Sequence, residues 1–150
     1  MSDITVPGKV RAWYGLSGEI LVENELWHLV RLGPISLPHP PLINLFLRAG
    51  LPKENRLRLS FEHEYGHLQT LPLALLHLAL LRPRRASLGS WLAALIAHQA
   101  VWELAAEGWV VAKLGREYRE TYHGRGERPA VFWLAMLGLA ALGTLRALRG

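Results

Sequence analysis

The run FEHEYGHLQTLPLALLHLALL, residues 61–81, decides the fold that we expect for this chain. Its first half contains acidic and imidazole side chains, whereas its second half is apolar apart from His77. A run of this length predicts a helix rather than a strand. Two more long apolar segments follow at about 87–113 and 130–147, and both are helical by length. The link Arg-Pro-Arg-Arg at 82–85 permits only an antiparallel hairpin between the first two helices.

The first 60 residues have a different character. Prolines interrupt the chain over 33–41, residues 42–49 predict a short helix, and 57–60 predict either a brief strand or a plain linker. An exposed strand at 57–60 would bind an extended peptide by adding it to a sheet edge. Three runs with β character predict a small sheet, with a turn at 23–25: 10–14, 19–22 and 26–32. The expected fold is therefore mainly α, with a helical core over 61–150 preceded by a small β-containing region over 1–60.

Composition excludes several kinds of site. The chain has no Cys, so disulfides, thiolate ligands and Cys nucleophiles are excluded, and a metal would need His and carboxylate ligands. Asp3 is the only Asp, which rules out any site that needs a second one. The net charge of +5 comes mostly from Arg residues in short clusters between the apolar segments. That spacing is typical of charge flanking a membrane and does not favour a nucleic-acid partner.

The apolar segments also predict where the protein resides. They make up about half of the chain and leave few polar faces, and Trp102, Trp109 and Trp133 fall near one set of helix ends, as in an interfacial belt. We expect an integral membrane protein of a bacterial or archaeal inner or plasma membrane, with lipid as a partner. The basic link at 82–85 would face the cytoplasm. Because no segment has 18 uninterrupted apolar residues, a cytoplasmic helical bundle is the alternative.

The HEYGH sequence at 63–67 points to a metal site. On a helix, positions i and i+4 share one face, so His63 and His67 can hold one ion while Glu64 reaches a water bound to it. This is the chemistry of a zinc hydrolase, in which Glu64 is the general base. The structural alternative is a pair of solvated or interfacial histidines on a helix.

A catalytic zinc ion normally takes three protein ligands. Thr70 and Leu73 stand where the extended HExxHxxGxxH pattern requires Gly and His, so a Glu from a later helix remains. The ELAAE run offers Glu103 and Glu107, and the hairpin brings both to the height of the histidines. His63 and His67 lie 21 and 17 positions before residue 84, and the two carboxylates lie 19 and 23 positions after it. Burying unpaired carboxylates in an apolar bundle would cost stability. A cation bound between the carboxylates and the histidines would offset that cost.

HExxH followed on a later helix by ExxA(D/E) resembles the gluzincin metallopeptidases over about 61–113. Within them it is most similar to the CAAX-prenyl-protease and heat-shock membrane-peptidase branch and to the minimal soluble gluzincins. The resemblance implies a zinc-dependent endopeptidase that cleaves peptides or membrane-protein segments by Glu-assisted attack of zinc-bound water. It also implies that Glu103 is the third ligand and that Glu107 accepts a hydrogen bond from a ligand imidazole. The family usually has Asp where this chain has Glu107, so the two roles are exchangeable.

Further residues complete the set of candidates. Tyr122 and His123, with Tyr118 nearby, are candidate donors to the oxyanion of the reaction. Gln69 and His98 are expected to face one another between the helices, and His28 and His77 to have structural or surface roles. Two other functions compete with a membrane peptidase: a non-catalytic metal-binding membrane scaffold or sensor, and a soluble minimal gluzincin.

Overall fold

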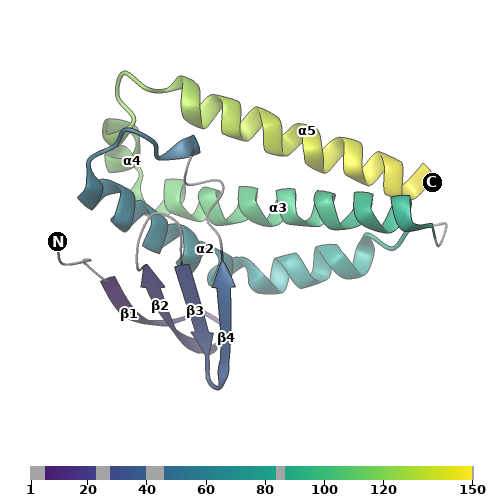
Figure 1. Ribbon diagram of the computed structural model, residues 1–150, viewed down its shortest axis with the longest axis horizontal. Helices are drawn as coiled ribbons and strands as arrows, with labels where there is room; N and C mark the ends of the chain where they lie inside the picture. Colours follow the sequence, from purple (N-terminus) through teal and green to yellow (C-terminus); the bar gives the residue numbers. More distant parts are fainter. Residues whose placement is uncertain (1–5, 23–27, 40–45, 84–86, 150) are drawn as a thin grey trace.

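The computed structural model describes residues 6–22, 28–39, 46–83 and 87–149. Three long helices lie side by side, with α3 between α2 and α5, and a small sheet packs below α2 (Figure 1). The prediction of a mainly helical chain with a small N-terminal β region is confirmed. The predicted turn at 23–25 and the first half of the predicted helix at 42–49 lie outside the described residues.

The sheet is an antiparallel meander in the order β1 (Val6–Arg11), β2 (Ser17–Val22), β3 (His28–Leu32) and β4 (Ile35–His39). The proline-rich stretch was predicted only to interrupt structure, yet it contains β4. A proline is tolerated there because β4 is an edge strand, where half of the backbone groups need no ladder partner. Pro38 pairs in register with Leu29 of β3.

Helix α2 (Lys53–Leu80) begins eight residues before the predicted start. Both predictions for 57–60, a strand and a linker, are wrong, because these residues form part of this helix. Leu57 faces the sheet and packs against Ile20 and Val22, while Leu59 belongs to the core cluster that contains Leu47. The helix therefore has two apolar faces in this turn, and 57–60 offers no strand edge to a peptide.

Pro72 lies inside α2 and has no amide hydrogen to donate to the carbonyl of Leu68, four residues earlier. The hydroxyl of Tyr14 donates to that carbonyl instead, at 2.6 Å. The indole of Trp13 donates to the neighbouring carbonyl of Gln69 at 2.9 Å. The turn between β1 and β2 is thereby attached to α2 directly after the HEYGH sequence.

The α2–α3 hairpin forms as predicted, with α3 running over Leu88–Leu114 and capped by the Ser87 hydroxyl, which accepts a hydrogen bond from the amide of Ser90 at 3.1 Å. Two helices follow: the short α4 (Arg116–Thr121), which was not predicted, and α5 (Glu127–Arg149). Gly66 lets α2 and α3 approach closely, since a Cβ there would lie only 2.5 Å from the carbonyl oxygen of Ala106.

Among the described residues, α5 alone is long and apolar enough to span a membrane. Polar and charged side chains interrupt α2 and α3, so a transmembrane bundle of three helices is not established. The predicted tryptophan belt is not supported either. Trp102 donates to the carbonyl of His67 at 3.2 Å and Trp109 packs on Tyr65, so both are partly buried against α2.

Candidate metal centre

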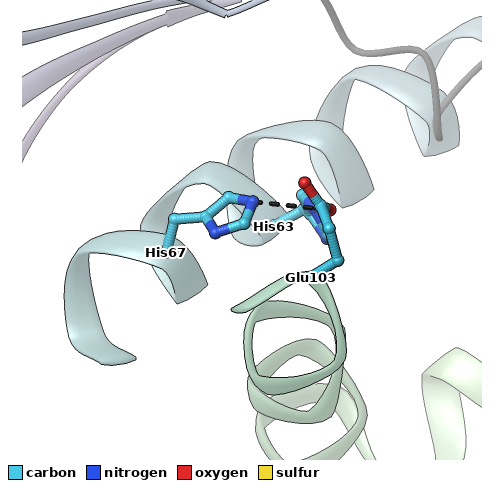
Figure 2. Close-up of side chains that lie close together, drawn as sticks. All are labelled: His63, His67 and Glu103. Atoms are coloured by element: carbon cyan, nitrogen blue, oxygen red, sulfur yellow. Dashed lines mark hydrogen bonds and ion pairs between the residues drawn. The ribbon is translucent and has the colours of Figure 1, made fainter. Parts of the chain in front are cut away.

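Two histidines of α2 and one carboxylate of α3 form a buried cluster. His63, His67 and Glu103 each offer one ligand atom, and these atoms lie within 4.8 Å of one another. Figure 2 shows Glu103 reaching from α3 to the two histidines of α2. Oε2 of Glu103 lies 2.9 Å from Nε2 of His63 and 3.5 Å from Nε2 of His67. The close approach of the helices at Gly66 makes this meeting possible, because Gly66 lies between the two histidines on α2.

Glu107 lies on the other side of His63. Its Oε2 is 2.8 Å from Nδ1 of His63, so the two carboxylates take opposite nitrogens of one imidazole. The oxygen of Glu103 that lies against Nε2 of His63 also lies 3.5 Å from Nε2 of His67, whereas Glu107 lies against Nδ1 of His63. The geometry thus separates two roles that the sequence left exchangeable. It favours Glu103 as a ligand and Glu107 as the acceptor that orients the ring.

Two further residues, Arg48 and Tyr118, hold Glu107. Arg48 donates to its Oε2 at 2.8 Å, and the hydroxyl of Tyr118 donates to its Oε1 at 2.8 Å. Arg48 and Glu107 are 1% and 0% exposed. Tyr118 was considered only as an oxyanion donor. No pattern around Arg48 signals its role, because it stands alone between apolar residues, far from α3 in sequence.

When no metal is bound, His63 is protonated, because its imidazole lies between the carboxylates of Glu103 and Glu107. Burial lowers the pKa of His63, but hydrogen bonds to Glu103 and Glu107 outweigh it and raise this pKa to about 9. Burial raises the pKa of Glu107, yet Arg48 and His63 hold it at about 2. Burial likewise raises the pKa of Glu103, and its hydrogen bonds with the histidines bring it well below the usual range. Both carboxylates are therefore charged and can accept a cation.

A cavity of about 160 Å³ adjoins the cluster. Glu64 and His67 supply its polar lining, and the rest of the wall is apolar: Val30, Leu32, Leu68, Leu71 and Trp102. A larger open groove of about 670 Å³ lies along β1 to β3 and shares no residue with this cavity. The smaller cavity is the one beside the metal ligands, and its size and lining suit an apolar side chain.

His28 is a further residue that the sequence did not assign to the site. It was predicted to be structural or at the surface, but it is buried, and its Nδ1 lies 2.7 Å from Oε1 of Glu64. A lone histidine in a β-like run carries no signal for such a contact. The structure also differs from the predicted contact between Gln69 and His98. Gln69 accepts from the amide of Trp13, and His98 stacks on His77.

The predicted oxyanion donors are not brought to the cavity. The hydroxyl of Tyr122 lies 3.4 Å from Arg48, within the buried cluster on the Glu107 side of the site. His123 is exposed in the turn after α4. Tyr118 donates to Glu107, and Tyr122 accepts from Arg48, the partner of Glu107, so these two tyrosines support the carboxylate rather than the cavity. A role for Tyr122 or His123 at the oxyanion has no support in this geometry.

Compared as a whole with protein-family models, with curated proteins and with solved structures, the chain matches none of them. The likeness of its two motifs to the gluzincins therefore stays a prediction, and its function has to be argued from the geometry of the His63, His67 and Glu103 cluster.

Proposed function

We propose that this chain is a zinc-dependent endopeptidase. The observation that carries the proposal is the buried convergence of His63, His67 and Glu103 beside a cavity that Glu64 lines. Two imidazoles and one carboxylate are a ligand set that catalytic zinc uses, with a position left for water. Arg48 neutralises the charge of Glu107, and the proton on His63 balances the charge of Glu103. A metal ion would replace that proton.

Each residue has a distinct part in the proposed reaction. A zinc ion held by the three ligands would supply an activated water and polarise the scissile carbonyl. Glu64 takes the proton of the attacking water and returns it to the leaving amine. Glu107 fixes the ring of His63 through its Nδ1 hydrogen. The apolar wall of the cavity receives a side chain of the peptide next to the bond that is cut.

We also propose that the bundle is embedded in a membrane by the end remote from the sheet. Exposed large apolar side chains gather in three segments: 73–80 of α2, 88–96 of α3 and 131–148 of α5. The segments of α2 and α3 lie at the end of the bundle remote from the sheet, beside the C-terminal half of α5 (Figure 1). Such a large exposed apolar surface is unusual for a soluble protein. The exposed apolar segment of α3 ends at Ile96, and Glu103 lies about 10 Å further along the helix at 1.5 Å per residue, so the site would lie beyond the embedded end of the bundle.

Metal-free protein is expected to bind one zinc ion per chain and to release about one proton at pH 7. The proton comes from His63, whose pKa of about 9 keeps it protonated until zinc displaces it. Zinc affinity should therefore rise with pH and level off above about pH 9. Calorimetry in two buffers of different ionisation enthalpy measures the proton, and elemental analysis measures the zinc. His63→Ala should lose the bound zinc. Equal zinc content in this variant and the parent would refute the site.

The membrane proposal predicts that the expressed protein needs detergent. On phase separation in a detergent that clouds on warming, it should enter the detergent-rich phase, because the three apolar segments bind detergent as they would lipid. A variant with Glu at Leu134, Leu137 and Leu142, which lie exposed on α5, should shift toward the aqueous phase. Recovery of the unmodified protein in the aqueous phase would favour a soluble peptidase and leave the metal site untouched.

A further inference from the structure

His28 connects the N-terminal sheet to the predicted general base. It lies on β3, and its Nδ1 is 2.7 Å from Oε1 of Glu64. The two side chains are 1% and 2% exposed. A carboxylate can only accept, so Nδ1 carries the hydrogen and donates it. Hydrogen bonds to a charged acceptor in a buried place are among the stronger ones in proteins.

The same face of β3 forms one wall of the cavity. Side chains two residues apart on a strand point to the same side, so His28, Val30 and Leu32 share a face. Val30 and Leu32 line the cavity together with Glu64 and His67. The sheet is therefore part of the site, and His28 stands on its inner face, against Glu64.

An ordinary structural role does not account for His28. Among the described residues, its Nε2 is buried and has no hydrogen-bond partner. Leaving a buried polar nitrogen unsatisfied costs stability, and buried rings with a structural role normally have both nitrogens bonded. Within the described part of the chain, the bond to Glu64 is the polar contact that this ring makes, so its burial serves Glu64.

We propose that His28 is a positioning residue for the peptidase reaction, holding the carboxylate of Glu64 in a fixed orientation at the cavity through its Nδ1 hydrogen. This inference rests on the proposed function. It gives the N-terminal sheet a part in catalysis: β3 carries both the partner of the base and the apolar wall for the substrate. Loss of this bond removes one of the contacts that orient the carboxylate, so the carboxylate spends less time where it can take a proton.

The test compares His28→Leu and His28→Asn in the full-length, zinc-loaded protein in detergent, with fluorescently labelled casein as the substrate. Leu and Asn have the same branched shape, but only Asn offers an N–H where Nδ1–H lies. We expect His28→Leu to lower kcat about 10- to 100-fold with KM and zinc content unchanged. His28→Asn should recover part of this loss. His77→Leu, the same change on the distal half of α2, is the matched control and should keep the parent kcat.

A second measurement does not depend on activity. In nitrogen-edited NMR spectra of the metal-free protein, the Nδ1 hydrogen of His28 should move when Glu64 is replaced by Gln, because an amide is a weaker acceptor than a carboxylate. If His28→Leu does not fold, this measurement still tests whether His28 donates a hydrogen bond to Glu64. An unmoved signal, or a fully active His28→Leu beside an active parent and an inactive Glu64→Gln, would overturn the role of His28 alone. A parent that binds zinc and cleaves nothing would overturn the proposed function, and the inference with it.

Discussion

Replacing Glu64 by Gln is expected to lower the kcat for casein cleavage at least about 100-fold while the protein keeps its zinc. Gln fills the same space in the cavity but cannot take a proton from the attacking water. The zinc remains because the three predicted ligands are His63, His67 and Glu103, and Glu64 is not among them. Steady-state kinetics and elemental analysis on the same preparation measure the two effects.

Glu62→Gln is the matched control for this experiment. It makes the same chemical change two residues earlier on α2, where the carboxylate pairs with Lys113 at 2.6 Å, away from the cluster. We expect its kcat to stay within about twofold of the parent, because Glu62 pairs with Lys113 and belongs neither to the ligand cluster nor to the cavity lining. If Glu64→Gln cleaves casein as fast as Glu62→Gln, Glu64 is not the base. The metal would then serve a scaffold or sensor.

Arg48→Ala is expected to cost about 3–5 kcal/mol in the free energy of unfolding, the usual cost of breaking a buried ion pair from one side. Arg48 and Glu107 are joined at 2.8 Å in the interior, and removal of Arg48 leaves the Glu107 charge with only His63 and Tyr118 as described partners. Denaturant unfolding of the metal-free protein in detergent measures the effect, since bound zinc would add its own stabilisation.

The double variant Arg48→Met with Glu107→Gln separates the lost charge from lost packing. It removes both charges and keeps similar volumes, so it should recover a large part of the stability that Arg48→Met alone loses. Its zinc affinity should still be lower, because a neutral amide accepts the Nδ1 hydrogen of His63 less strongly than the Glu107 carboxylate. A loss below about 1 kcal/mol for Arg48→Ala would mean that the buried pair contributes little to the fold.

Sequence patterns predicted the hairpin and the cluster, because both depend on local properties of the chain: the length and apolarity of a segment and the number of residues in a link. Length and apolarity predict a helix, and the four-residue link leaves only an antiparallel return. Counting positions from the link then puts Glu103 at the height of His67. The same reasoning failed at 57–60 and at β4, where the outcome depended on packing: α2 extends to bury Leu57 against the sheet, and β4 pairs along a free edge.

The sequence by itself determined which donors α2 and α3 can offer to a metal, since helical periodicity fixes the face on which His63, His67 and Glu103 project. Only the tertiary structure decided how Glu103 and Glu107 divide their places around His63, and only it brought Arg48 and His28 to the site. These contacts join residues 36 and 59 positions apart. Their geometry follows from how the sheet and the helices pack, and no pattern within one segment records that packing.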